Sequence, residues 1–237
     1  MKKLVSLSLF FFISYLAVYA TIQIPDKLIY NGKEYNPGNF YLEDFFIKNP
    51  DKKPDFQLTS TALWRGYIAT FEIEDDQLFL TNVETISYNE TDSTYHINYT
   101  SVLHTIFPDS KRVKADWFTG IFWGGKNKEK SPMPFEYDEY CMFEIKDGNI
   151  VKEKNLKRSE FKNFKKQQLK AFKQTDKYQQ CIEQLKEDYS KQVEVQKQMM
   201  ESMGNTEYRE ESSTSLGKRA KRFIDYNIFN FIPEFIE

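Results

Sequence analysis

Apolar and polar residues alternate in short runs through the first two thirds of the chain, which is typical of β-strands. The runs extend from Lys27 to about Glu153, and turn signals stand between them at Asn31-Gly32, Asp75-Asp76 and Asp147-Gly148. Asn-Gly and Asp-Gly pairs favour tight hairpins because both residues tolerate positive φ. The pattern predicts a mainly antiparallel β-domain over residues 21–155.

Three hairpins are predicted within this domain, over Lys27–Tyr35, Trp64–Val83 and Tyr140–Lys152. Phe40–Ile47 lies in a proline-containing stretch and could form a short helix. Thr85–Tyr99 is polar, and we expect it to be irregular.

The hydrophobic period changes from Ser159 onward. Apolar residues then recur at helical spacing, first up to Phe172 and again from Tyr178 to Tyr189, with Thr175-Asp176 between the two stretches as a capping signal. The apolar stripe fades after Tyr189. We therefore predict a helical segment over residues 156–203 that docks over part of its length and projects over the rest, and an α+β fold for the whole chain.

Two further segments complete the expected organisation. Residues 204–217 are rich in Ser, Thr and Glu and are typical of a flexible linker. Residues 218–237 form a basic and then strongly apolar tail. This tail either folds back on the main domain as an edge strand or short helix, or serves as a partner-binding peptide.

The first twenty residues have the pattern of a secretory signal peptide. Lys2 and Lys3 precede an apolar run that ends on small residues at Ala17-Val18-Tyr19-Ala20. We expect cleavage after Ala20 and export to a periplasmic or extracellular location. The alternative is a retained membrane anchor, but the run is at the short end of what spans a bilayer.

Charge is unevenly distributed, although the whole chain has a formal net charge of only −2. Residues 21–151 carry an acidic excess, whereas residues 152–173 hold nine basic and two acidic side chains. An exported protein rarely meets nucleic acid, so we expect no nucleic-acid partner. The basic segment is interpreted as a solvated helix face, with a protein, an envelope polymer or a membrane surface as the alternative contacts.

Two cysteines, Cys141 and Cys181, remain in the chain. In an oxidising compartment they either form one disulfide or stay as free thiols, because spacing alone does not show whether their Cα atoms approach each other.

The densest candidate site combines two short segments, Trp64-Arg65-Gly66-Tyr67 and Ala115-Asp116-Trp117-Phe118-Thr119-Gly120. Each places a charged residue beside a tryptophan and near a glycine on a predicted strand. Arg65 and Asp116 could form a structural ion pair across strands. Alternatively, Trp64, Arg65, Tyr67, Asp116 and Trp117 form a shallow ligand-binding site in which the arginine grips a carboxylate or sugar hydroxyls.

Signals for catalysis are weak. The chain has no Gly-x-Ser-x-Gly and no His-Glu-x-x-His motif. Its two histidines, His96 and His104, are too far apart on one continuous strand to share a metal. We therefore expect no catalytic residues, no metal and no cofactor.

The two tryptophan segments also carry a resemblance. Together with Ala69, Glu72, Ile73, Leu78, Leu80 and Phe107, they resemble a group of small bacterial proteins built around Trp-Arg-Gly-Tyr, an aromatic-Glu-Ile strand and a later Ala-Asp-Trp-Phe-(Ser/Thr)-Gly. Phe71 stands where that group would have a tryptophan. The resemblance covers most of residues 62–150 and implies a shared fold unit without an activity.

Three functional hypotheses follow. The first is an exported, non-catalytic binding or envelope-associated module. The second is a hydrolase-like enzyme with a site near Arg65 and Asp116. The third is an inhibitor or accessory subunit that binds through the helical segment and the tail.

Overall fold

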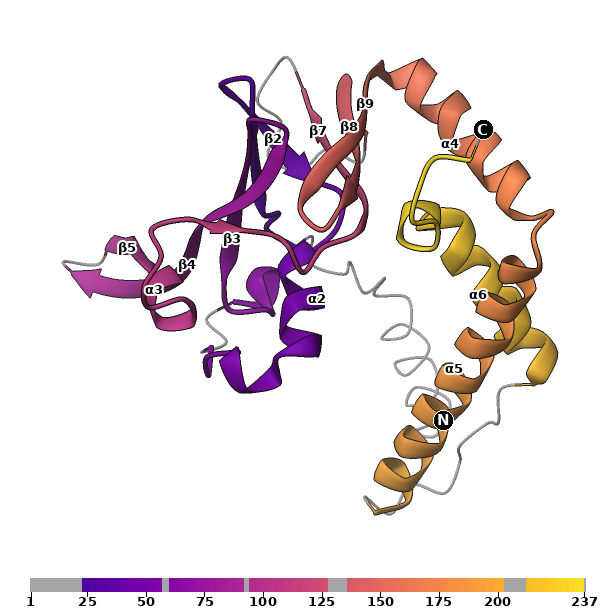
Figure 1. The fold of residues 1–237 in the computed structure, drawn as a ribbon. Helices are drawn as coiled ribbons and strands as arrows, with labels where there is room; N and C mark the ends of the chain where they lie inside the picture. Colours follow the sequence, from indigo (N-terminus) through magenta and orange to yellow (C-terminus); the bar gives the residue numbers. More distant parts are fainter. Residues whose placement is uncertain (1–22, 57–59, 92–93, 128–135, 203–211, 237) are drawn as a thin grey trace, which may run out of the picture.

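The computed structural model describes residues 23–56, 60–91, 94–127, 136–202 and 212–236. It shows an α+β fold in which a strongly curved, mostly antiparallel sheet is packed by helices on both its inner and its outer face (Figure 1). The strands are β1 (Lys27–Tyr30), β2 (Lys33–Pro37), β3 (Ile68–Glu74), β4 (Gln77–Thr91), β5 (Thr94–Ser101), β6 (Val113–Lys114), β7 (Gly120–Lys126), β8 (Glu139–Lys146) and β9 (Asn149–Lys157). The α-helices are α2 (Tyr41–Lys48), α3 (Leu103–Ile106), α4 (Arg158–Phe172), α5 (Asp176–Ser202) and α6 (Ser213–Tyr226).

The sheet closes on itself to form a barrel. Its strands follow the order β3-β1-β2-β7-β8-β9-β4, and β4 pairs back with β3. The pairing of β4 with β9 consists of one residue pair, Gln77 with Asn149. The strands β1 and β3 run parallel, whereas the other pairs are antiparallel. Closure leaves few free strand edges in the barrel itself.

All three predicted hairpins are confirmed. They are β1–β2, β3–β4 and β8–β9, and each has a two-residue turn at the predicted position. Both residues of every turn have positive φ, between 47° and 73°. This is the backbone of the type I′ turn, whose twist matches that of the flanking strands.

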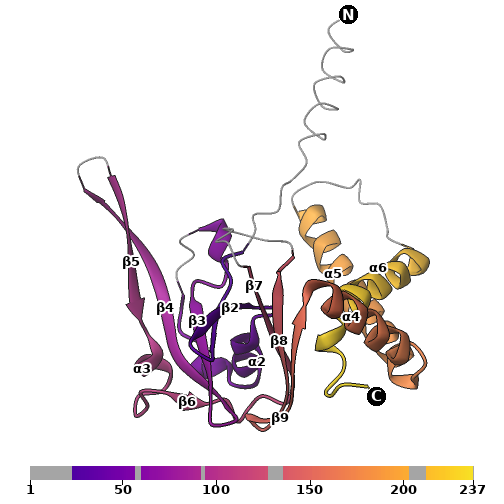
Figure 2. The same cartoon turned by 90° about the horizontal axis from the view of Figure 1, so that it is seen from above.

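The prediction for Thr85–Tyr99 was wrong. The segment forms a long antiparallel ribbon from β4 and β5, with Ile86 opposite Tyr99 and Tyr88 opposite Ile97. β-branched and aromatic residues favour strands even where polar neighbours hide the alternation. The ribbon extends from the barrel on the side away from α4, α5 and α6 (Figure 2).

The barrel encloses one of two main hydrophobic cores, which we call the barrel core. Helix α2, predicted as a short helix, supplies four of its buried side chains. The ring of Tyr41 stacks on Phe122 with centroids 3.8 Å apart, and its hydroxyl accepts a hydrogen bond of 3.0 Å from the Trp123 amide. Burial of these rings fixes α2 against the inner surface of the sheet.

The second core, which we call the helix core, lies on the outer face of β7 and β8. Strand β8 is buried on both faces: Cys141 and Phe143 point into the barrel core, while Tyr140 and Met142 point toward the helices. Successive strand residues face opposite sides, so a strand between two cores is apolar at nearly every position. Three helices, α4, α5 and α6, cover this outer face and form the helical layer.

Helix α5 packs against the rest of the protein over its first part only, as its fading apolar stripe predicts. Tyr178, Ile182 and Tyr189 are buried, whereas Val195 and Met199 near the end of the helix are exposed. Figure 1 shows this end extending beyond the neighbouring helices.

The linker prediction was wrong in its last five residues. Helix α6 begins at Ser213, inside the expected 204–217 linker, and Ser212 caps it by accepting a 3.3 Å hydrogen bond from the Ser215 amide. Leu216, Ala220 and Ile224 form its buried face at helical spacing. The Ser- and Thr-rich start of the helix makes this helical spacing of apolar residues hard to recognise in the sequence. Residues 203–211 lie outside the described residues.

The apolar tail folds back on the chain, as the first of its two interpretations expects. After α6 it passes through a short 3₁₀ turn, Ile228–Asn230, and then runs beside β8 and α4. The Phe235 amide donates to Glu144 Oε2 at 3.1 Å, and Gln168 makes two hydrogen bonds with the backbone of Ile236, at 2.7 and 2.8 Å. Most apolar side chains of the tail are therefore buried by its own chain, whereas Phe223 and Tyr226 stay exposed.

Candidate functional site

The structure separates the two charged residues of the predicted site. Arg65 is fully buried and bonds Asp26 through Nη2 and Oδ1 at 3.0 Å, and its guanidinium lies 3.6 Å from the centroid of the Phe40 ring. Asp116 is exposed in the turn before β7 and is not the partner of Arg65. The possible Arg65–Asp116 ion pair was wrong, because the carboxylate that pairs with Arg65 belongs to Asp26.

The remaining residues of that site also point to different places. Neither tryptophan segment is a strand: Trp64 and Arg65 follow a 3₁₀ turn, Thr61–Leu63, and Asp116 lies in the turn before β7. Trp64 is 54% exposed, whereas Trp117 packs against the rings of Phe45 and Phe107. None of these five described residues lines either of the two hollows described below.

Tyr67 and Asp26 are held in the interior by hydrogen bonds. The Tyr67 hydroxyl donates to Glu43 Oε1 at 2.7 Å, and burial together with this carboxylate raises the pKa of the phenol. Asp26 Oδ1 accepts a 2.9 Å hydrogen bond from the Ala69 amide. Burial raises the pKa of Asp26 to about 6 although the Arg65 charge opposes that shift. These groups tie the start of β1 to the start of β3.

The two cysteines are free thiols in the structure. Cys141 lies in the barrel core, and its Sγ is 3.6 Å from the Gly124 carbonyl oxygen. Cys181 packs against the helix core on the other side of the sheet. The proposed Cys141–Cys181 disulfide is therefore not formed, because the two sulfur atoms face opposite sides of β8.

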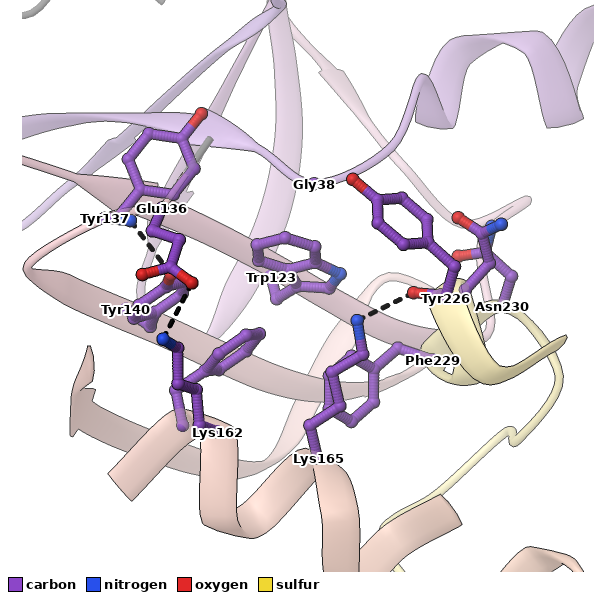
Figure 3. A pocket seen from close by; sticks show the side chains of 12 residues that line it. Gly38, Trp123, Glu136, Tyr137, Tyr140, Lys162, Lys165, Tyr226, Phe229 and Asn230 are labelled. Atoms are coloured by element: carbon purple, nitrogen blue, oxygen red, sulfur yellow. Dashed lines mark hydrogen bonds and ion pairs between the residues drawn. The ribbon is translucent and has the colours of Figure 1, made fainter. Parts of the chain in front are cut away.

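A pocket of about 300 Å³ lies where the barrel meets the helical layer, and we call it the interface pocket. Figure 3 shows the Trp123 side chain at its centre, with Glu136 and Lys162 on one side and Lys165 and Tyr226 on the other. It is lined by Gly38, Trp123, Glu136, Tyr137, Tyr140, Phe161, Lys162, Lys165, Tyr226, Asn227, Phe229 and Asn230.

Glycine and stacked rings shape the wall of the interface pocket. A Cβ atom on Gly38 would lie 1.9 Å from the Trp123 ring, so only glycine lets the indole take this position. Tyr140 stacks on Phe161 with ring centroids 3.8 Å apart and an interplanar angle of 5°. This packing joins strand β8 to helix α4 and gives the pocket an apolar floor.

Charged groups stand at the rim. Lys162 Nζ lies 2.7 Å from Glu136 Oε1, and this contact lowers the pKa of Glu136. Lys165 Nζ donates to the Tyr226 carbonyl oxygen at 2.7 Å and lies 5.0 Å from the centroid of the Tyr226 ring. Burial lowers the pKa of Lys165. An apolar floor with a few charged groups at its edge is the usual composition of a small-molecule site.

A second hollow, of about 430 Å³, lies beside the turns of the first two hairpins. It is lined by the acidic side chains Glu72, Glu74, Asp75, Asp76 and Glu153. Glu74 pairs with Arg112, and the Tyr30 hydroxyl donates to Glu153 at 2.5 Å. Within the described ranges, no three His, Cys, Asp or Glu side chains are placed to hold a metal ion.

Sequence reasoning did not find the interface pocket, because its residues come from five separate parts of the chain. The available signal was the lysine-rich segment 152–173, which supplies Lys162 and Lys165. The sequence pattern indicates a solvated face, and Lys162 is indeed exposed, but Lys165 is partly buried and lies beside the Tyr226 ring.

Comparisons with known proteins add no assignment: no family model, curated protein or solved structure matches the chain. Over the residues that the structure describes, no helix is both long enough and apolar enough to cross a membrane.

Proposed function

We propose that the protein is an exported, non-catalytic binding module and that its ligand occupies the interface pocket. The observation that carries this proposal is the exposed ring of Tyr226 at the mouth of a pocket with the Trp123 indole at its centre. Tyr226 is 76% exposed. An exposed ring alone needs no explanation, but a ring beside an apolar pocket with charged groups at its rim fits ligand binding.

The placement of the interface pocket supports the same proposal. Its floor belongs to the barrel and α4, whereas its mouth belongs to the end of α6 and the turn that follows. Binding sites often lie where two structural units meet, since side chains from both can converge there.

We expect small ring-bearing ligands to bind at Tyr226. NMR titration of the isotope-labelled protein with monosaccharides, N-acyl amino acids and aromatic acids at millimolar concentration would measure this. Tyr226→Ala should weaken binding by about three- to tenfold, the effect of losing one aromatic contact. The variant keeps the backbone carbonyl oxygen of residue 226, to which Lys165 Nζ donates. Tyr99→Ala, which removes a similarly exposed ring on the distant strand β5, is the matched control.

Two results would overturn the proposed site. One is a panel in which no compound shifts the resonances of Tyr226, Asn227 or Asn230. The other is a ligand whose binding is weakened equally by Tyr226→Ala and Tyr99→Ala.

Export is the second part of the proposal and is supported by the signal-peptide pattern of residues 1–20. Expression of the full chain in a bacterial host should give secreted or periplasmic material that begins at Thr21. Intact-mass measurement would check the cleavage position. Material that stays in the cell and retains Met1 would contradict this expectation.

A further inference from the structure

The charges around the interface pocket do not balance. Among the described residues, Glu136 is the only carboxylate that lines it, and this group is engaged by Lys162 at 2.7 Å and by Arg158 at 3.8 Å. Lys165 has no carboxylate within ion-pair distance among the described residues. The lining therefore carries a surplus of one positive charge.

Lys165 is the source of that surplus. Its ammonium group is partly buried and donates one hydrogen bond, to the neutral carbonyl oxygen of Tyr226. An ammonium group has three donors, so two remain for a ligand. Because a buried charge without an opposite charge is unfavourable, an anion placed here would be stabilised by a charge-assisted hydrogen bond.

The surroundings of Lys165 favour a ring with hydroxyl groups. The Tyr226 ring and the Trp123 indole offer aromatic surfaces, whose negative faces attract the weakly positive C–H groups of a sugar. The side-chain amide of Asn230 forms no hydrogen bond with another described residue, and it can both donate to and accept from hydroxyl groups. The pocket volume of about 300 Å³ is at the small end for ligand sites and suits one or two rings.

We propose that the interface pocket binds a sugar ring that carries a carboxylate, with Lys165 as the carboxylate-binding residue and Tyr226 and Trp123 as the ring-binding residues. This inference rests on the proposed function, since it names the ligand class of the same site.

The test compares methyl β-glucuronide with methyl β-glucoside, which share a ring and differ in a carboxylate against a hydroxymethyl group. NMR titration of the full chain should show the glucuronide binding about tenfold more tightly, as expected for one charge-assisted hydrogen bond. Lys165→Gln should abolish the preference, so that the variant binds the glucuronide no more tightly than the glucoside. Lys166→Gln, at the exposed neighbouring lysine outside the pocket lining, should change neither.

Other outcomes separate the inference from the proposal on which it rests. Equal affinity for the two sugars would overturn the carboxylate assignment and leave a neutral-ring site intact. Acetate binding as tightly as the glucuronide would overturn the sugar assignment. Absence of any shift with both sugars would overturn the inference, while the wider ligand panel would still decide the proposed function. Lys165→Arg, which retains the charge, should keep the preference for the glucuronide and serves as a second variant if Lys165→Gln unfolds.

Discussion

Asp26→Ala is expected to lower the free energy of unfolding by about 3–5 kcal/mol, the usual cost of breaking a buried ion pair from one side. The variant would leave the Arg65 guanidinium fully buried without its carboxylate. It would also remove the acceptor of the Ala69 amide at the start of β3. Urea unfolding of the full chain, followed by tryptophan fluorescence, measures this change.

The position of this pair explains why the effect should reach the whole barrel. Asp26 directly precedes β1, and Arg65 lies in the turn before β3, the parallel neighbour of β1. Arg65 additionally donates to the Ile24 carbonyl oxygen at 3.1 Å. The pair thus aligns the only two parallel strands of the described barrel, for which no hairpin turn can set the register.

Two controls test this explanation. Glu187→Ala breaks an exposed ion pair with Lys191 on α5 and should leave the urea midpoint nearly unchanged. The double variant Asp26→Leu with Arg65→Met removes both charges and should cost much less than the sum of the two single changes, because no buried charge is left unpaired. If the free energy of unfolding of Asp26→Ala lies within about 1 kcal/mol of that of the original protein, the ion pair does not stabilise the barrel.

The hairpins could be predicted from sequence because their information is local. Asn31-Gly32 and Asp147-Gly148 set both the turn and the register of the strands beside them. The partner of Arg65 was not predictable in this way. Asp26 is 39 residues away, and it meets Arg65 only through the parallel pairing of β1 with β3, which has no local signature.

The interface pocket could not be predicted for a related reason. Its aromatic residues lie in separate elements, and three of the six are core positions: Tyr140 and Phe161 are buried against each other, and Phe229 is buried beside them. Only the docking of α6 and the turn after it beside β7 and α4 brings Trp123 and Lys165 into one pocket. The pocket is a property of how two layers pack, and no single segment encodes it.

Removing residues 212–237 is expected to undo the helical layer. The segment contributes seven buried side chains to the helix core, namely Leu216, Ala220, Ile224, Ile228, Phe229, Ile232 and Phe235. Burial of each large apolar side chain is worth about 1.5–3 kcal/mol, so their sum rivals the total stability of a typical domain, about 5–15 kcal/mol. Circular dichroism should show lost helix content and an early, non-cooperative thermal transition.

A single substitution tests the same core without shortening the chain. Ile224→Ala removes a side chain that is 0% exposed and should cost about 2–5 kcal/mol, whereas Ile47→Ala makes the same change at a helical position that is 76% exposed and should cost far less. If Ile224→Ala and the shortened chain both unfold like the original protein, α6 and the tail are not part of the core. They would then be a separable segment. That result would favour the third functional hypothesis, an accessory subunit that binds through its helical segment and tail.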